Sequence, residues 1–98
     1  MDGYFILDGT DVVEARTWAE WTRWWFSAQP PAQRTEVRGL VIETVFTGHD
    51  HRPERQGPPE VFETRLSGEP VGRYASWESA RAGHERAVNR VSVSWRRP

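Results

Sequence analysis

The sequence predicts a single α+β domain in which a small antiparallel sheet packs against two helices. Three observations indicate this class: an Asp-Gly hairpin signal near the N-terminus, two β-rich runs in the middle of the chain, and two stretches whose apolar residues recur at helical spacing. The 98 residues provide material for one domain of modest stability. We expect an N-terminal hairpin and a central hairpin to form the sheet.

Each hairpin is predicted from its own pattern. Tyr4–Leu7 and Val12–Ala15 flank a turn that begins with Asp8-Gly9, and Asp-Gly between apolar runs is a strong hairpin signal. Val37–Thr47 carries apolar residues on both alternating faces, which is typical of a central strand. Val61–Leu66 alternates more cleanly and is expected to pair antiparallel with that strand.

Polarity selects one register for the central hairpin. Neighbouring strands favour partners of matching polarity on each face, and a slip by one residue would exchange the two faces. The register that satisfies this rule opposes Phe46 with Phe62, Thr44 with Thr64, Ile42 with Leu66 and Glu43 with Arg65.

The first helix is predicted over Trp18–Ala28. Thr17 and Glu20 have the spacing of a capping box, and tryptophans follow at helical intervals. Pro30 and Pro31 end the helix, because proline donates no backbone hydrogen bond and disfavours helix in the residue before it. Because aromatic side chains bury large areas, the tryptophans are expected to lie in the core or at an interface.

The second helix is expected to begin at Trp77, with Ser76 as its cap. Gly83 in mid-helix reduces helix stability by up to about 1 kcal/mol relative to alanine, which indicates a close crossing with the sheet. Residues 92–98 are expected to form either an edge strand or a disordered tail. The residues expected to face inward from this helix are Trp77, Ala80, His84, Ala87, Val88 and Val91.

Composition excludes several classes of site. The chain has no cysteine, which removes disulfides, thiolate nucleophiles and cysteine-based metal centres. All thirteen basic residues are arginine, so Schiff-base and P-loop lysines are absent as well. No apolar run is long enough for a signal peptide or a membrane span, so we expect a cytoplasmic protein with no membrane partner. We also expect no cofactor.

The loop between the two central strands carries the one cluster with metal-ligand character. His49 and His51 flank Asp50, and imidazole and carboxylate groups suit zinc, iron or manganese. His84 would complete a three-histidine site with a vacant position for water. A polar surface loop and a hydrogen-bonded core histidine are the more ordinary interpretation, so we expect no stoichiometric metal. A small metal-dependent enzyme is the alternative.

Two further patterns have chemical alternatives. Glu43 and Glu63 would form an acid/base pair on adjacent strands, but Arg65 favours an ordinary cross-strand ion pair with Glu43. The net charge of −1 argues against a binder of nucleic acid or of a small nucleotide, although the C-terminal part is basic. The residues that would supply charge and a stacking ring for that function are Arg81, Arg86, Arg90, Trp95, Arg96 and Arg97.

A set of spaced motifs runs along most of the chain. They are Thr44-Val45-Phe46 through Asp50-His51, Gly57-Pro58-Pro59, Phe62-Glu63-Thr64, Arg73-Tyr74-Ala75-Ser76-Trp77-Glu78 and Gly83-His84. In this combination the chain resembles a family of small phage and prophage proteins of similar length, with a similar hairpin start and tryptophan helix. The resemblance implies no known activity. The chain departs from the family pattern at His49, where an apolar residue is commoner, and in the charged segment 52–55.

We expect a non-enzymatic accessory protein of phage type that binds and modulates a host protein or protein complex, such as a defence system. The binding part of this expectation follows from the lack of catalytic apparatus, and the phage part follows from the resemblance. The loop 48–59 lengthens the chain without adding core, so recognition explains its composition better than folding does. The expected contact residues, in this loop and at an aromatic edge of the first helix, are His49, Asp50, His51, Arg52, Arg55 and Trp24.

Overall fold

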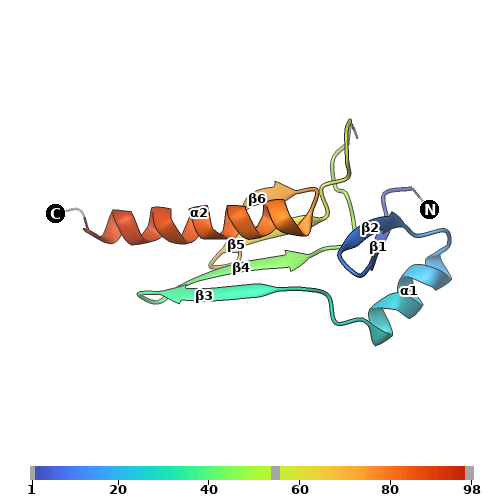
Figure 1. The fold of residues 1–98 in the computed structure, drawn as a ribbon, viewed down its shortest axis with the longest axis horizontal. Coiled ribbons are helices and arrows are strands. Elements are labelled where there is room, and N and C mark those ends of the chain that lie inside the picture. The colour runs from blue at the N-terminus through green and yellow to red at the C-terminus, as the bar shows by residue number, and fades with distance from the viewer. Residues whose placement is uncertain (1, 54–55, 97–98) are drawn as a thin grey trace.

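The computed structural model describes residues 2–53 and 56–96, and its helices and antiparallel sheets confirm the α+β class. The molecule is elongated, 53 by 30 by 20 Å. Helix α2 lies along the larger sheet, and the hairpin and α1 form the end of the molecule away from the C-terminus (Figure 1). In chain order the elements are β1 (Phe5–Asp8), β2 (Asp11–Glu14), α1 (Trp18–Ser27), β3 (Gln33–Val37), β4 (Leu40–Phe46), β5 (Phe62–Leu66), β6 (Glu69–Tyr74) and α2 (Trp77–Arg96).

The N-terminal hairpin forms as its turn residues predict. Asp8 of β1 pairs with Asp11 of β2, which leaves Gly9 and Thr10 as a two-residue turn. Gly9 has a φ of 63°, a left-handed conformation that glycine adopts without strain. The hairpin is a separate two-stranded sheet and is not part of the four-stranded sheet.

Helix α1 begins where the capping-box spacing predicts. The hydroxyl of Thr17 accepts a hydrogen bond from the backbone N–H of Glu20 at 3.1 Å. The Glu20 carboxylate in turn accepts from the backbone N–H of Arg16 at 2.9 Å and from its guanidinium at 2.8 Å. In a capping box the acidic side chain accepts a hydrogen bond from the backbone N–H of the cap residue itself, whereas here Glu20 accepts it from Arg16, one residue before the cap. The contacts of Thr17 and Glu20 together fix the start of the helix.

The larger sheet is an antiparallel meander in the order β3-β4-β5-β6. The expectation of one strand over Val37–Thr47 is wrong, because the chain turns at Arg38 and Gly39 and Val37 ends β3. These two residues have φ values of 49° and 85°, as a type I′ turn requires. The predicted register of β4 against β5 is confirmed: Ile42 pairs with Leu66, Glu43 with Arg65, Thr44 with Thr64 and Phe46 with Phe62.

The strands that the sequence pattern did not predict are the two edges of this sheet. Strand β6 contains Pro70 and Gly72, and its register against β5 shifts between Thr64 and Arg65. Proline and register shifts are typical of edge strands, where a lost ladder hydrogen bond leaves no neighbour unpaired. Strand β3 alternates but carries mostly polar residues, because only one of its faces is covered.

Helix α2 begins at Trp77, as predicted, and the hydroxyl of Ser76 accepts a hydrogen bond from the backbone N–H of Ser79 at 3.1 Å. Neither alternative for the C-terminal tail is right where the structure describes it, because α2 continues to Arg96; residues 97–98 lie outside the described part. The valine and serine alternation near the end of α2 fits a strand, but Val88 and Val91 also continue the sheet-facing stripe at helical spacing.

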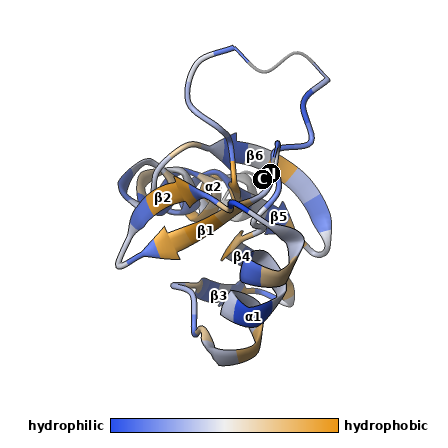
Figure 2. Cartoon of the chain, turned by 90° about the vertical axis from the view of Figure 1, so that its right-hand side faces the viewer, coloured by the Kyte–Doolittle hydropathy of each residue, from blue (hydrophilic) through white to orange (hydrophobic). Residues whose placement is uncertain are grey.

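Aromatic rings connect the hairpin end of the molecule to the sheet. The ring of Phe46 lies 5.4 Å from Trp24, 5.7 Å from Trp25 and 5.3 Å from Phe62 between centroids. Phe62 continues this series to Trp77 of α2 at 5.9 Å. Figure 2 shows the apolar strands of the hairpin beside the sheet at this end. The buried apolar cluster gathers here and consists of Leu7, Phe46, Val61, Phe62 and Ala80.

The middle of the interface between α2 and the sheet is polar. His84 is buried, with Nε2 2.8 Å from the hydroxyl of Thr35 and Nδ1 2.8 Å from that of Thr44. The Thr44 hydroxyl lies 2.7 Å from that of Thr64. Burial lowers the pKa of His84, so the neutral imidazole offers one donor and one acceptor. A threonine hydroxyl can act as donor or as acceptor. One hydrogen-bonded chain therefore crosses strands β3, β4 and β5 through Thr35, His84, Thr44 and Thr64.

Gly83 permits the close crossing that its position in mid-helix predicts. A Cβ atom at Gly83 would lie 2.2 Å from the ring of Tyr74 on β6, far inside van der Waals contact. The same ring lies over Gly72, where a Cβ atom would be 2.5 Å from the Tyr74 hydroxyl. Tyr74 is therefore held between two glycines, and the lack of a side chain at Gly83 lets α2 approach β6 closely here.

We predict that Gly83→Ala lowers the free energy of unfolding by about 1–3 kcal/mol, although alanine favours helix, because the methyl group displaces Tyr74. Thermal or urea denaturation measures this change. In a Tyr74→Ala background the same substitution should be neutral or should stabilise by up to about 1 kcal/mol, since helix propensity then acts alone. An equal loss in both backgrounds would contradict this role for Tyr74.

Candidate functional site

The base of the long loop is built into the fold. After β4 the chain passes along the N-terminal segment, where Gly48 accepts a hydrogen bond from Phe5 N at 2.9 Å and Asp50 N donates to the carbonyl of Gly3 at 3.0 Å. A Cβ atom at Gly48 would lie 2.9 Å from the Trp25 ring. The loop therefore leaves the sheet through a narrow passage between α1 and the N-terminus. Beyond this base the described loop residues on either side of positions 54–55 project away from the rest of the molecule (Figure 2).

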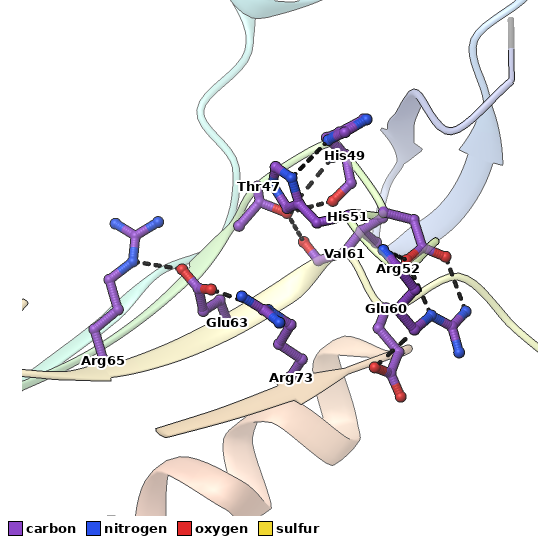
Figure 3. A network of polar contacts seen from close by, with 10 residues as sticks. Thr47, His49, His51, Arg52, Glu60, Val61, Glu63, Arg65 and Arg73 are labelled. Carbon is purple, nitrogen blue, oxygen red and sulfur yellow. Dashed lines mark hydrogen bonds and ion pairs between the residues drawn. The ribbon is translucent and has the colours of Figure 1, made fainter. Parts of the chain in front are cut away.

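His49 and His51 meet at the start of this loop. Their Nδ1 atoms lie 2.9 Å apart (Figure 3). The His49 ring is 4.4 Å from the ring of Tyr4 between centroids. A hydrogen bond between two imidazole nitrogens requires one of them to be unprotonated, so at least one ring is neutral in this arrangement. Of the two, His51 is the exposed ring.

Asp50 lies between the two histidines in sequence, but its side chain is directed toward Arg52. Its side chain is 1% exposed and forms a two-point ion pair with Arg52, at 3.0 Å to Nε and 2.8 Å to one terminal nitrogen. The Arg52 hydrogen bonds lower the pKa of Asp50 to about 2, more than burial raises it. Both oxygens of this carboxylate are therefore engaged in the ion pair with Arg52.

Arg52 also ties the two sides of the loop together. Its guanidinium donates to the carbonyl of Gln56 at 2.9 Å and to that of Pro58 at 2.9 Å. Asp50 and Arg52 are thus engaged within the loop, and a role for either in binding stays a prediction. Arg55, the remaining expected contact residue of the loop, lies outside the described residues.

The three histidines do not form one site. His84 lies under α2 between threonines, whereas His49 and His51 lie at the start of the loop. Catalytic zinc sites use three protein ligands, and structural sites use four. Within residues 2–53 and 56–96 no group of three or more histidine, aspartate or glutamate side chains is placed to hold a metal. Among these described residues the geometry therefore supplies two imidazole ligands and no third.

Glu63 of the central strands forms ion pairs with two arginines and does not form an acid/base pair with Glu43. Both oxygens of Glu63 are engaged, one with Nε of Arg65 at 2.7 Å and one with Nε of Arg73 at 3.2 Å (Figure 3). The cross-strand ion pair of this face is thus between Glu63 and Arg73, and the expected pair of Glu43 with Arg65 is replaced by it. Arg65 opposes Glu43 in register, but its guanidinium reaches along its own strand.

Trp24, the expected aromatic contact residue, has a packing role. Its Nε1 donates to the carbonyl of Leu7 at 3.1 Å, and its ring meets Phe46 edge-on. The exposed aromatic residues of α1 are instead Trp18, which is 57% exposed, and Phe26, which is 88% exposed. Trp24 is therefore engaged in the contact between α1 and the hairpin, whereas the rings of Trp18 and Phe26 are largely exposed to solvent.

One side of α1 presents aromatic rings to the surface. We call this surface the α1 aromatic face and define it as Trp18, Trp21, Thr22, Trp25 and Phe26. The last four line an open hollow of about 280 Å³. Intervals of three, four, seven and eight residues place the set on one side of the helix. The sequence contains this signal, but a tryptophan stripe is ordinarily buried, so the pattern alone does not reveal its exposure.

The C-terminal arginines whose side chains the structure describes do not gather on one surface. Arg81 lines a hollow together with Glu78 and Glu85, so its charge is surrounded by carboxylates. Arg86 and Arg90 lie one turn apart elsewhere on α2. The side chains of Trp95, Arg96 and Arg97 lie outside the described part, so the predicted nucleic-acid surface stays a prediction.

The chain has no match among protein-family models, curated proteins or solved structures. In the part that the structure describes, neither helix is long and apolar enough to cross a bilayer. The site is therefore interpreted from its own geometry. In that geometry the most exposed aromatic rings of the described residues are Phe26 and Trp18 of the α1 aromatic face, which we take as the candidate site.

We predict that Asp50 makes stability depend on pH at the acid end. Its pKa falls from 3.8 to about 2 in the folded protein, so its stabilising effect is complete above pH 4 and is lost as the pH falls toward 2. The difference in unfolding free energy between wild type and Asp50→Asn should narrow by about 2 kcal/mol over that range. Urea denaturation at each pH measures it, and a constant difference would show that the ion pair does not stabilise the fold.

We also predict that the purified protein contains no stoichiometric metal, since two imidazoles form an incomplete site. Elemental analysis of protein prepared without an affinity tag provides the measurement. About one zinc, iron or manganese per chain, lost in His49→Ala or His51→Ala, would instead establish the metal-dependent alternative.

Proposed function

We propose that this protein is a non-enzymatic binding protein that docks a protein partner through the α1 aromatic face. The observation that carries the proposal is Phe26, which is 88% exposed beside the hollow lined by Trp21, Thr22 and Trp25. An aromatic side chain in solvent does not stabilise the fold, whereas its burial is worth roughly 1.5–3 kcal/mol. Exposed aromatic residues around a hollow are typical anchors of protein interfaces.

The arrangement fits a groove on the partner. Trp18, Trp25 and Phe26 occupy helical positions i, i+7 and i+8, which is how an amphipathic helix presents anchors to an apolar groove. The side chains are pre-organised, because Trp18 stacks on Trp21 at 5.1 Å and Trp25 stacks on Phe46 at 5.7 Å. Little side-chain entropy is then lost on binding. The hollow is too open to enclose a small molecule, which favours a protein as the ligand.

The resemblance to small phage and prophage proteins supports a partner in the bacterial host. A chain whose chemistry lies in an exposed aromatic face would act by occupying a surface of its target. We therefore propose a host protein or protein complex, such as a defence system, that this protein binds and modulates.

We predict that Phe26→Ala and Trp18→Ala each weaken partner binding by about tenfold or more. Thermal stability should stay unchanged in Phe26→Ala and fall slightly in Trp18→Ala, which loses the ring contacts with Tyr4 and Trp21. The partner is first identified by photo-crosslinking from position 26 in a lysate of the host bacterium, and affinity is then measured by calorimetry with purified components.

Val71→Ala provides the matched control, because Val71 is also an exposed apolar residue, 51% exposed, but lies on β6. Crosslinking from position 71 should not capture the same protein. Binding that survives the combined Phe26→Ala and Trp18→Ala change would show that the site lies elsewhere.

A further inference from the structure

The two edges of the four-stranded sheet differ in how well they are protected. Strand β6 carries Pro70 and a register shift, both of which obstruct the addition of another strand. Strand β3 has neither, and it lies at the margin of the sheet with no further element beyond it (Figure 1). An unpaired strand edge is a template for pairing with another chain. Strand β3 is therefore the edge open to such pairing.

The tight turn after β3 determines which of its backbone groups are unused. Val37 and Leu40 flank a two-residue turn, so they form a hydrogen-bonded pair of the ladder. Hydrogen-bonded and non-hydrogen-bonded pairs alternate, so Thr35 is bonded to β4 as well. The N–H and C=O groups of Arg34 and Glu36 consequently point outward from the sheet.

We infer that two copies of this chain pair through β3, antiparallel and with the two-fold axis at Thr35. In this register Arg34 of each copy stands directly opposite Glu36 of the other. These are the residues whose backbone groups point outward, so each pair can exchange both of its backbone hydrogen bonds. The four-stranded sheets of the two copies then become one continuous sheet.

Charge complementarity identifies the second copy as the occupant. Arg34 and Glu36 lie on the sheet face away from α2, and their side chains are each 59% exposed and 3.8 Å apart along the strand. A two-fold axis between these residues places an opposite charge across from both of them, in both copies. Opposite charges directly across two strands stabilise a sheet, and like charges destabilise it. The edge is therefore complementary to itself in this register.

The space beside β3 can accept the added strand. A hollow of about 380 Å³ lies between β3 and α2. A strand added next to β3 directs every second side chain toward the α2 face of the sheet, where this hollow lies. Gln33, on that face, has a buried Oε1 atom with no hydrogen-bond partner among the described residues. The residues that line the hollow are Gln33, Thr35, His84, Glu85, Val88 and Asn89.

The test exchanges the charges of this edge. Sedimentation analysis from micromolar to submillimolar protein should show a concentration-dependent dimer of the wild type. Arg34→Glu alone and Glu36→Arg alone each place like charges opposite one another twice, so each should weaken self-association roughly tenfold. A mixture of the two variants restores opposite charges at both pairs and should form a heterodimer at the wild-type concentration.

Glu36→Pro supplies an independent check, because it removes an outward N–H and leaves the ladder between β3 and β4 intact. Circular dichroism should be unchanged, and dimerisation should be lost. A wild-type chain that stays monomeric at submillimolar concentration would overturn the inference, and so would single charge variants that associate as the wild type does. An extended peptide that binds the monomer, with binding lost in Glu36→Pro, would overturn it in favour of a foreign strand at the same edge.

Discussion

Phe46 stands at the junction on which the arrangement of this molecule depends. Its ring contacts Trp24 and Trp25 of α1 on one side and Phe62 of β5 on the other. No strand pairing joins the N-terminal hairpin to the four-stranded sheet apart from an isolated bridge between Tyr4 and His49 in the described residues. Ring packing therefore sets the position of α1 relative to the sheet. The orientation of the α1 aromatic face and the passage through which the loop leaves β4 follow from it.

Signals contained in a few neighbouring residues were sufficient for much of the fold. The Asp-Gly turn of the hairpin and the Thr17 cap act locally, so the sequence shows them directly. The register of β4 against β5 was also predictable, because both faces constrain it at once. The edge strands were not predictable in this way. Strand β3 follows a proline pair and ends at an Arg-Gly turn, and β6 carries Pro70 and Gly72, so neither shows a continuous β pattern.

The candidate site was less accessible to sequence analysis than the fold. The pairing of His49 with His51 follows from their spacing, but the commitment of Asp50 to Arg52 depends on burial that the chain acquires only when the loop passes the N-terminal segment. Trp24 and Phe26 show the same limit. Their places on the helix are readable, but which one meets the hairpin depends on how α1 docks. His84 was placed correctly on the inward side of its helix, although its threonine partners, Thr35 and Thr44, come from two different strands.

The contacts of Arg52 divide the long loop into two parts with different freedom to vary. One guanidinium binds Asp50 at the base and the carbonyls of Gln56 and Pro58 across the loop, so it closes a small ring of chain outside the sheet. Residues between this closure and the core, such as Asp50, make the contacts that hold the base of the loop to the fold. Chain length added within the segment that Arg52 closes, at the tip of the loop, changes the entropy of loop closure only slowly. This tip is therefore a natural place to insert an affinity epitope or a fluorescent reporter, and a place where sequence can diversify while the body of the protein stays the same.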